Sequence, residues 1–491
     1  MAVQEHDYSP EADWNQVYVG GEWLTPDDAG SIDVQEPYTQ EVFAEVPACT
    51  PEDVERAFDA AEEAQEDWGS RPHEERQQLL EDVGSQMMTR MSEFKELLAV
   101  EAGSAVPKQM GEFNYCRGIV DWMAEFDDVE SEHESNFDAK TNRVVREPVG
   151  VVATVTPWNF PFYMAMRALA PAVLMGNSVV LKPSTETPIS GGLAVARLFE
   201  EAGLPPGVLN VVTGRGSDIG DAVVADPRAQ SVNFTGSTAV GSRVGRLAGD
   251  NVAEVALELG GNCPYYVTED CDLDWAVTAG LFGTFMHQGQ ICVSINRHIV
   301  HEDVYDDYVE EFASRAEELG RGDPQDATNI IGPLINESQR DQILGFIEDS
   351  VEQGATIEAG GGHDGLVVEP TVLSDATNEM SAACNEHFGP VAPVIPAADD
   401  EEAIEIANDT DYGLSSAVHC QDLERGREIA REIEAGMVHV NDQPMHDEPH
   451  MPFGGVKKSG VGRFNGEWII DEMTETKWIS EQSEQRNYLV F

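Results

Sequence analysis

The chain has 491 residues and a formal net charge of −62, because 91 aspartates and glutamates stand against 29 lysines and arginines. Such an acidic chain is not expected to bind nucleic acid, since the phosphates would be repelled. Hydrophobic residues make up 41% of the chain, enough for ordinary cores, but no stretch approaches the ~18 uninterrupted apolar residues of a membrane helix.

The N-terminal third mixes short strands with helices. We expect a hairpin at 17–23, a helix at 50–67, a further helix near 73–101, a polar stretch at 127–140 and a possible strand at 143–146. The helix at 50–67 has the clearest start. Thr50 can cap it, Pro51 suits its first turn, and Asp53 completes a box-like cap.

From Gly150 onward, strand and helix patterns alternate. Strands are expected at 150–156, 179–181, 208–212, 231–234 and 252–257, with helices at 162–175, 188–202, 217–225 and 238–248. This alternation predicts βαβ units and a parallel sheet with helices on both faces. A second α/β region follows, with helices at 303–319, 337–353, 400–408 and 422–434, and the polar tail 474–490 is expected to be extended.

Cysteine usage and the first residues indicate a reducing compartment. The seven cysteines are scattered without a C-x-x-C pair, so neither a disulfide framework nor a metal site is expected. Residues 1–15 lack the basic and apolar regions of a signal peptide. We therefore expect a cytoplasmic protein without a membrane partner.

The segment FTGSTAVG at 234–241 follows an expected strand and opens an expected helix. Its small residues would let a phosphate approach the backbone, and the N-terminus of the helix favours an anion. Ser237 can also cap this helix. Because the segment is not G-x-G-x-x-G, an ordinary capped helix explains it equally well.

Two further segments, one with Lys182 and Glu186 and one at 452–462, can each be interpreted either as part of a site or as an ordinary loop. Lys182, one of only seven lysines, leaves an expected strand at its carboxyl end, where parallel sheets bind ligands. Glu186, four residues on, can accept hydrogen bonds from ribose hydroxyls, although by spacing alone a solvated loop is the simpler interpretation. The glycine-rich segment 452–462 has the composition of a long surface turn.

Cys292 lies among apolar neighbours close to Gly289, and seen singly it is interpreted as a buried structural cysteine. Cys263 also lies beside glycines, so the two are not distinguished by their surroundings. Glu258 ends the apolar strand at 252–257, where a carboxylate is costly unless it is paired or functional. It is therefore a candidate for a shifted pKa.

Seven co-linear segments together resemble the aldehyde dehydrogenase superfamily. They are PWNFP at 157–161, LKPSTETP at 181–188, FTGSTAVG at 234–241, LELGG at 257–261, GQIC at 289–292, EHFGPV at 386–391 and PFGGVKKSGVG at 452–462. They occur in the family's order, and the resemblance extends from the VGGEW hairpin to the tail.

The resemblance implies oxidation of an aldehyde to a carboxylate. Cys292 is implied as the nucleophile, whose thiolate attacks the aldehyde carbon and forms a thioester. The Asn159 side chain and the Cys292 N–H are implied as the oxyanion hole, and Glu258 as the general base for hydrolysis. Cys263 matches no role in the family.

The resemblance also implies NAD as the cofactor. The implied cofactor-binding residues are Trp158, Lys182, Glu186, Gly216, Thr235, Gly236, Ser237, Val240, Gly241, Leu259, Glu386 and Phe388. A glutamate at position 186 favours NAD over NADP, because the 2′-phosphate would meet a like charge.

The implied architecture is α/β, with a Rossmann-like NAD-binding domain, a second α/β catalytic domain and a small β oligomerisation element. The NAD-binding domain comprises 1–126 and 148–258, the catalytic domain 259–450, and a connecting segment 451–473. Strands at 127–147 and 474–491 are implied to pair across subunits of a homodimer or homotetramer, which would cover their edges.

The motifs specify the substrate and the subfamily less closely than they specify the reaction. GQICVSINRHIV and NDQPMHDEPHMPFGG resemble the benzaldehyde and vanillin dehydrogenase branch, whereas QEPYTQEV near residue 38 and Asn262 depart from the usual family pattern. An aromatic or medium-chain aldehyde suits apolar neighbours at Phe162, Tyr163, Met164, Met286, Ile291 and Val293. Arg167 favours a semialdehyde acid instead if it pairs with a substrate carboxylate. It is equally compatible with a subunit bridge or a solvent-facing position.

Two other function classes remain open at this stage. A non-catalytic binding or structural protein on the same scaffold would be expected to lack Cys292, Glu258 or Asn159, and all three are present. A cofactor-free cysteine hydrolase would need a histidine base, for which His287 is the near candidate in sequence.

We considered two explanations for the excess of acidic over basic residues. Disorder is disfavoured because the acids are interspersed with periodic apolar residues. The favoured explanation is adaptation to high salt, which screens surface repulsion.

Overall fold

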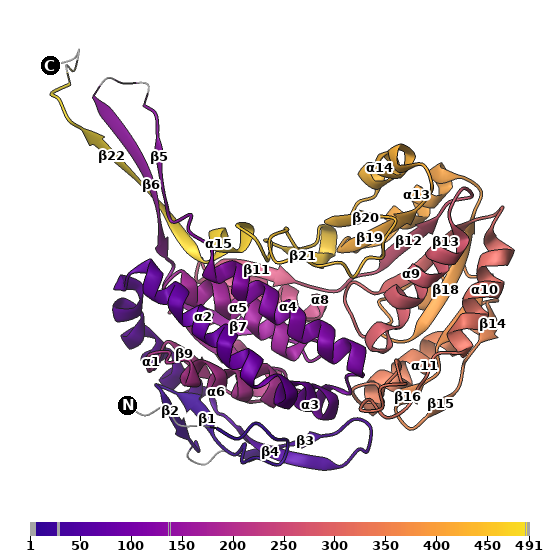
Figure 1. The fold of residues 1–491 in the computed structure, drawn as a ribbon, viewed down its shortest axis with the longest axis horizontal. Helices are drawn as coiled ribbons and strands as arrows, with labels where there is room; N and C mark the ends of the chain where they lie inside the picture. Colours follow the sequence, from indigo (N-terminus) through magenta and orange to yellow (C-terminus); the bar gives the residue numbers. More distant parts are fainter. Residues whose placement is uncertain (1–5, 27–29, 136, 138, 487, 489–491) are drawn as a thin grey trace.

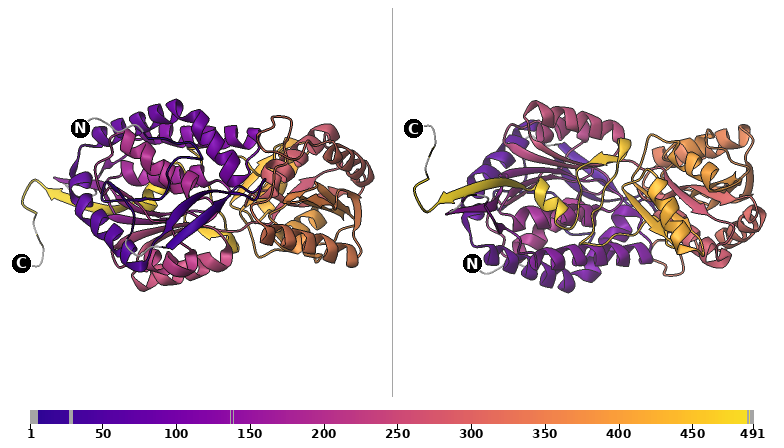
Figure 2. Two further views of the ribbon diagram at one scale, coloured as in Figure 1. Left: turned by 90° about the horizontal axis from the view of Figure 1, so that it is seen from below. Right: turned by 90° about the horizontal axis from the view of Figure 1, so that it is seen from above.

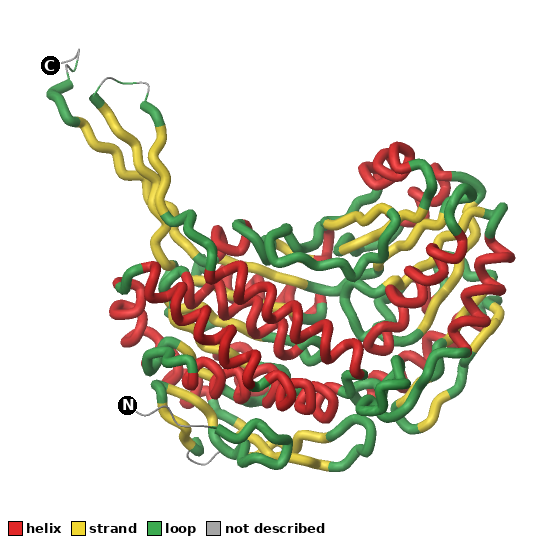
Figure 3. The backbone as a smooth tube through the Cα atoms, viewed as in Figure 1, coloured by secondary structure: helices red, strands yellow, loops and turns green. Residues whose placement is uncertain are grey.

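Two α/β bodies and a projecting arm make up the chain (Figures 1 and 2). The computed structural model describes residues 6–26, 30–135, 137, 139–486 and 488. The indigo-to-magenta body contains the sheet of the first half of the chain, and the orange body contains the sheet of the second half. In both, helices lie over the strands (Figure 3).

The first sheet has eight strands in the order β2-β1-β9-β8-β7-β10-β11-β21. The strands are β1 (Val17–Val19), β2 (Glu22–Leu24), β7 (Val151–Val155), β8 (Ser178–Lys182), β9 (Leu209–Val211), β10 (Ala229–Thr235), β11 (Glu254–Glu258) and β21 (Gly460–Val461). Strands β7 to β11 are parallel, as the alternating pattern predicted. Strands β7, β8 and β9 follow one another in one direction across the sheet, whereas β10 lies on the other side of β7. The strand order thus reverses between β7 and β10, which is a topological switch point.

Helices cover both faces of this sheet because successive strand residues point to opposite sides. Val152 packs with α2 to α6, whereas Val151 and Ala153 pack with α1, α7 and α8. The helices are α1 (Pro51–Ser70), α2 (His73–Thr89), α3 (Met91–Ala102), α4 (Val106–Ala124), α5 (Pro161–Leu174), α6 (Ala194–Glu201), α7 (Asp221–Val224) and α8 (Thr238–Asp250), with π-helical turns η1 (Ile189–Leu193) and η2 (Gly216–Gly220).

The structure corrects three expectations in this region. The single helix expected near 73–101 is two helices, α2 and α3, separated at Arg90. Helix α4 was not predicted, because its sequence lacks a one-sided apolar stripe and even Lys108 and Glu112 are buried. The segment 127–140, for which the local pattern predicted only a polar stretch, contains a strand, β5 (Glu130–His133), and only the resemblance implied a strand there.

Buried carboxylates from the N-terminal helices cap two helices of the sheet layer. Glu112 accepts hydrogen bonds from the N–H groups of Phe162 (2.9 Å) and Tyr163 (3.1 Å), and its other oxygen pairs with Lys108. Glu101 caps η1 in the same way. These anions satisfy helix N-termini that would otherwise lack acceptors, and they hold α5, which follows the PWNFP segment, in place.

The second sheet has seven strands in the order β14-β17-β18-β13-β12-β19-β20, parallel except for the β14–β17 pair. Its strands are β12 (Cys263–Val267), β13 (Ile295–His301), β14 (Thr356–Ala359), β17 (Thr371–Ser374), β18 (Val391–Ala397), β19 (Ser415–His419) and β20 (Met437–Val440). The helices around it are α9 (Leu273–Phe285), η3 (Met286–Gly289), α10 (Tyr305–Glu317), α11 (Glu337–Glu352), α12 (Ser381–Cys384), α13 (Asp400–Asn408) and α14 (Leu423–Glu432), and a small hairpin joins β15 (His363–Asp364) to β16 (Val367–Val368).

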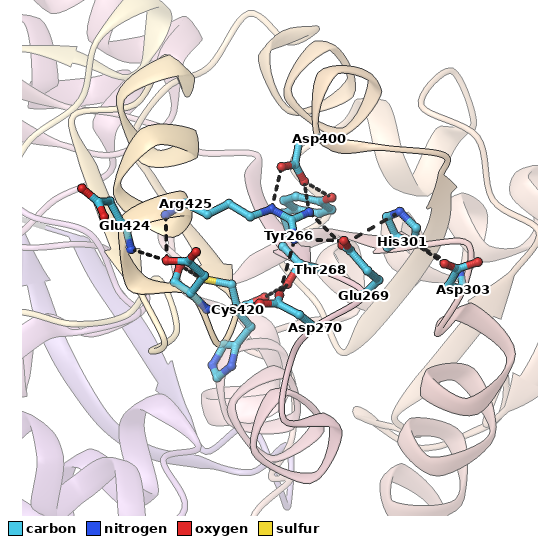
Figure 4. A network of polar contacts seen from close by, with 12 residues as sticks. Tyr266, Thr268, Glu269, Asp270, His301, Asp303, Asp400, Cys420, Glu424 and Arg425 are labelled. Atoms are coloured by element: carbon cyan, nitrogen blue, oxygen red, sulfur yellow. Dashed lines mark hydrogen bonds and ion pairs between the residues drawn. The ribbon is translucent and has the colours of Figure 1, made fainter.

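A polar network joins α13 and α14 to the end of β12 (Figure 4). Arg425 on α14 pairs with Glu269 at 2.7 Å and with Asp400 at 2.7 Å, and the hydroxyl of Tyr266 donates to Asp400 at 2.7 Å. One arginine therefore pairs with two carboxylates and links α13 and α14 to the end of β12.

The arm is a three-stranded sheet in the order β22-β6-β5, with β6 (Lys140–Pro148) between β5 and β22 (Thr474–Gln482) (Figure 1). The register runs from Thr474 opposite Pro148 to Gln482 opposite Lys140. Within one chain, these two segments pair with each other. Their expected pairing across subunits stays a prediction. Residues 136, 138, 487 and 489–491 of the expected strands lie outside the described residues.

The remaining elements are the hairpin of β3 (Gly30–Gln35) and β4 (Val42–Ala48), the turn η4 (Lys457–Ser459) and α15 (Trp468–Glu472). In the β3–β4 hairpin, Gln40 has a φ of 61°. This is the left-handed region that favours glycine. Among the described helices, none is both long and apolar enough to cross a membrane.

Candidate active site

The switch point of the first sheet places two of the sequence motifs side by side. The PWNFP segment follows β7 and the FTGSTAVG segment follows β10, and β7 and β10 are neighbouring parallel strands. Ligands of such sheets bind outside the carboxyl ends of the strands at this point. Glu258 is the last residue of β11, the next strand, so three motifs meet at one edge.

The loop that carries Cys292 crosses from the second body toward this edge. It turns sharply before the cysteine, because His287, Gln288 and Gly289 have φ values of 50°, 57° and 71°. A Cβ on Gly289 would lie 2.1 Å from the carbonyl oxygen of Gly389, so no side chain fits there. The glycine of the GQIC segment is thus required by close backbone contact.

Cys292 lies where two cavities meet, since it lines both of them. Its thiol is largely buried, and burial raises its pKa well above the usual value, with the charges of Glu258 and Glu386 acting in the same direction and that of Arg167 against it. Burial and the two carboxylates therefore both favour the neutral thiol over the thiolate.

The first cavity, of about 280 Å³, opens at the switch point between the two bodies. Seven of the residues predicted to bind the cofactor line it: Trp158, Thr235, Gly236, Ser237, Leu259, Glu386 and Phe388. Of the other five, Lys182 is the last residue of β8, Glu186 follows that strand, and Gly216 begins η2 after β9. Val240 and Gly241 lie in the first turn of α8. Residues from both bodies thus form one continuous edge around this cavity.

The first cavity has the form of a phosphate cradle. Helix α8 begins at Thr238 and points its free N–H groups toward the cavity edge formed by Gly236 and Ser237. Ser237 stands at the N-cap position, but its side chain makes no capping hydrogen bond, which corrects that expectation. A Cβ on Gly241 would lie 2.1 Å from Leu259, so glycine lets the helix pack closely on this wall. The residues present therefore fit a dinucleotide.

Lys182 and Glu186 extend the cradle beyond β8. Lys182 is buried, and burial lowers the pKa of its ammonium group to about 8. Its ammonium group donates to the carbonyl of Pro183 at 2.9 Å. Glu186 is exposed and accepts a hydrogen bond of 3.3 Å from Asn336, the N-cap residue of α11, so it bridges the two bodies.

Two groups in the first cavity were missed from the sequence. Gln339 and Gln342 reach it from α11, and the Gln339 amide donates to the carbonyls of His387 and Phe388, both at 3.2 Å. This holds Phe388, whose ring meets that of Trp158 edge-on with centroids 5.4 Å apart. A glutamine on an amphipathic helix has no sequence signal that would reveal this contact.

Glu386 closes the same side of the cavity. It accepts a hydrogen bond from the N–H of Gly261 at 3.0 Å. Burial raises its pKa to about 7, against the effect of that hydrogen bond. A Cβ on Gly260 would lie 2.3 Å from its carboxylate, so the glycines of the LELGG segment admit this side chain.

The second cavity, of about 220 Å³, is almost entirely apolar. Of the neighbours predicted for the substrate, Tyr163, Met164, Met286, Ile291 and Val293 line it. Phe162 does not, because its ring stacks on Phe94 in the core with centroids 4.1 Å apart. The remaining wall includes side chains from α4, α9 and the C-terminal loops that were not predicted: Tyr115, Phe160, Phe282, Met445 and Phe453.

Asn159 lines both cavities next to Cys292. One hydrogen of its amide nitrogen is donated to the carbonyl of Gln290 at 2.9 Å, which fixes the orientation of the side chain. The second hydrogen is free for another acceptor. The backbone N–H of Cys292 also has no acceptor among the described residues, so two donors are available at this point.

Glu258 is a buried carboxylate whose two oxygens lack hydrogen-bond partners within the described chain. Burial raises its pKa to about 8, while the charges of Arg167 and Arg463 act to lower it. A Cβ on Gly454 would lie 2.8 Å from this carboxylate. The glycine-rich segment 452–462 therefore packs against Glu258 and is not simply a surface turn.

The structure also decides between the alternatives for Arg167, His287 and Cys263. Arg167 is 1% exposed, so a solvent-facing position is wrong, and it is not among the residues that line either cavity. His287 is buried, and both of its ring nitrogens lack partners in the described structure, so it makes no hydrogen bond to Cys292. Cys263 is 1% exposed and packs behind the loop, with its sulfur 3.7 Å from the carbonyl oxygen of Cys292.

Comparison with known proteins agrees with this geometry. The model of the "Aldehyde dehydrogenase family" matches residues 23–479. The chain belongs to the aldehyde dehydrogenase family. It is therefore an oxidoreductase.

Relatives of this aldehyde dehydrogenase include enzymes named for aromatic substrates. A benzaldehyde dehydrogenase of Bacillus subtilis is 42% identical over 96% of this chain and 98% of its own length. A vanillin dehydrogenase of Corynebacterium glutamicum is also 42% identical, over 94% and 96%. A succinate-semialdehyde dehydrogenase of Arabidopsis thaliana is 37% identical over 94% and 88%. The structure of a betaine aldehyde dehydrogenase from Staphylococcus aureus in complex with NAD+ is 31% identical, covers both chains fully and superposes with a TM-score of 0.94.

Proposed function

We propose that this dehydrogenase oxidises an uncharged aromatic aldehyde to its carboxylate, with NAD as the cofactor and a thioester on Cys292 as the intermediate. One observation carries the proposal: Cys292 lies at the junction of an apolar cavity and a dinucleotide-shaped cavity. Family membership supports the reaction, and the relatives named for benzaldehyde and vanillin support the aromatic substrate.

In the proposed mechanism, Cys292 gives its proton to solvent as the aldehyde binds. The thiolate then attacks the carbonyl carbon, and the electron pair of the C=O bond moves to the oxygen. The oxygen that becomes negative is held by the free amide hydrogen of Asn159 and the N–H of Cys292. Loss of one such donor typically costs about 3 kcal/mol of barrier lowering. Bound NAD would be held by the predicted residues around the first cavity and supplies the hydride acceptor. Glu258 then takes a proton from water, which hydrolyses the thioester and releases the carboxylate.

A semialdehyde acid is the rival substrate, and the cavity walls argue against it. Lys108 reaches the apolar cavity, but it is already paired with Glu112. The other buried cation nearby, Arg167, does not line the cavity. No described cation is thus left to pair with a substrate carboxylate. The test is NADH formation by the protein with NAD and benzaldehyde, compared with succinic semialdehyde; a preference for the latter would contradict the proposed substrate.

Glu258→Gln should slow hydrolysis of the thioester more than hydride transfer. The amide keeps the shape of the carboxylate and breaks no hydrogen bond, but it cannot accept the proton of water. We expect a rapid first turnover of NADH, followed by slow steady-state turnover, with the acyl-enzyme visible by mass spectrometry. Glu254→Gln, an exposed glutamate on the same strand, is the control. Absence of both the burst and the adduct would assign Glu258 an earlier role.

The same residue predicts the pH dependence. A general base must be ionised, and burial raises the pKa of Glu258 to about 8. Hydrolysis of the wild-type acyl-enzyme should therefore rise with pH, by about tenfold between pH 7 and 9, and level off above the pKa. In Glu258→Gln this rise should disappear.

Glu186→Gln should narrow the preference for NAD over NADP. The wild-type carboxylate would repel the 2′-phosphate, and its removal should raise the relative kcat/KM for NADP by about tenfold. Glu337→Gln removes an exposed charge beside Asn336 without touching the proposed ribose position and should leave the ratio unchanged. A wild-type preference for NADP would show that the ribose assignment is wrong.

We also propose that the chain forms a homodimer or homotetramer through the arm. Within the described residues, β5 and β22 each pair only with β6, so both outer edges are open, and Trp478 is 67% exposed. Soluble proteins normally cover such edges.

The division into domains at residues 258 and 259 remains part of this proposal and falls between β11 and β12.

A further inference from the structure

Arg167 is a buried cation without a hydrogen-bond acceptor. All three nitrogens of its guanidinium group lack partners among the described residues. Aromatic rings surround it, with the guanidinium carbon 4.5 Å from the ring centre of Phe464, 4.6 Å from that of Phe453 and 5.6 Å from that of Tyr163. Cation–π contacts stabilise the charge only in part, so a buried arginine in this position requires anions nearby.

Two carboxylates respond to this charge. Arg167 lowers the pKa of Glu258 and of Asp447, in each case against a larger effect of burial. Glu258 is the proposed base and belongs to the first cavity. Asp447 lines the apolar cavity instead, so its carboxyl group lies in the wall of the proposed substrate site.

Asp447 is held rigidly in this position. One carboxylate oxygen accepts a hydrogen bond from the hydroxyl of Tyr163 at 2.8 Å, and the other accepts one from the amide of Asn465 at 2.6 Å. Tyr163 and Phe453 also line the cavity, and both pack against Arg167. At this part of the wall, the Asp447 carboxylate and the rings of Tyr163 and Phe453 line the cavity, while the guanidinium group of Arg167 lies behind them. The other carboxylate of the wall, Glu112, is paired with Lys108.

We propose that Asp447 determines charge selectivity: it supplies from within the chain the anion that Arg167 requires, and it repels aldehydes that carry a carboxylate. This inference rests on the proposed function, because it names the feature of the substrate site that excludes anionic aldehydes. It also explains how an arginine suited to binding a carboxylate can be present in an enzyme for uncharged substrates.

The test compares two aldehydes of the same shape and different charge, 4-formylbenzoate and 4-nitrobenzaldehyde. The measured quantity is the ratio of kcat/KM for the anionic to that for the neutral aldehyde, at ~1 M KCl so that distant charges are screened. In Asp447→Asn this ratio should rise about tenfold or more, mainly through a lower KM for 4-formylbenzoate. Asn465 can turn its amide to match the new side chain, because its oxygen has no partner now.

Two further variants make the test specific. Arg167→Met should lower the ratio, because the charge of Asp447 is then uncompensated, and adding Arg167→Met to Asp447→Asn should remove the gain. Glu448→Gln, which deletes the neighbouring carboxylate paired with His446 and His450, is the matched control and should leave the ratio unchanged. If Asp447→Asn does not fold alone, the double variant Asp447→Asn/Arg167→Met decides the matter, because its ratio should exceed that of Arg167→Met.

Folded Asp447→Asn with an unchanged ratio, or an equal rise in Glu448→Gln, would overturn the inference. Failure of the proposed function is distinguishable. If the wild type prefers aliphatic aldehydes, the aromatic assignment is wrong. The charge selectivity can still be tested, because the same variants can be assayed for the ratio of kcat/KM for succinic semialdehyde to that for valeraldehyde.

Discussion

Cys292→Ala is expected to abolish aldehyde oxidation while leaving NAD binding nearly intact. Without the sulfur, no covalent adduct forms, and removal of an enzyme nucleophile can cost about 10⁶-fold in kcat. The loop itself should persist, because its turn depends on Gly289 and on the hydrogen bond between Asn159 and the carbonyl of Gln290. Steady-state NADH formation and titration of NAD by calorimetry measure the two properties separately.

Cys263→Ala is the matched control, because Cys263 is buried, close in space and absent from both cavity walls. Its kcat should stay within about threefold of the wild type, although the small cavity left in the core lowers stability. Turnover near the wild-type level in Cys292→Ala would remove this residue from the mechanism. A large loss in Cys263→Ala would show that the wrong cysteine was chosen.

The second large effect concerns salt, and we propose that the protein is adapted to high ionic strength. The folded chain concentrates 91 acids and only 29 bases, so it must repel itself strongly at low ionic strength. Several of the basic groups are buried, among them Lys108, Lys182, Arg167 and Arg297. Helix α1 shows the consequence, since Glu52, Glu55, Glu62, Glu63 and Glu66 are all exposed.

The melting temperature and the activity should therefore rise steeply with salt. The Debye length falls from about 30 Å at 0.01 M to about 3 Å at 1 M, so that only charges in contact still interact. Thermal unfolding and NADH production across a KCl series from ~0.01 to ~3 M measure the effect. Light scattering over the same series should show stronger association, because all subunits carry the same sign of charge. A flat or falling melting temperature would refute the adaptation to salt and leave the family assignment untouched.

Local sequence was enough to predict most of the fold. The β-branched runs that became β7, β8, β10 and β11 are buried on both faces, and they alternate with helical segments, which defines a parallel sheet without further information. Local pattern failed where a helix is buried on more than one side. Helices α4 and α9 carry no one-sided apolar stripe. Helix α4 supplies several residues of the apolar cavity wall, and α9 supplies Phe282.

By itself, the sequence determined the family, the reaction and the identity of Cys292, Glu258 and Asn159 as candidates, since motifs are contiguous in the chain. Only the tertiary structure decided what surrounds them. The placement of Phe162 in the core depends on its contact with Phe94, in another helix. The burial of Arg167 between aromatic rings and the position of Asp447 in the cavity wall depend on segments nearly 300 residues apart. Contacts over such separations arise when the layers of the fold pack together. A local pattern of side chains therefore does not predict which distant residues will surround a buried charge.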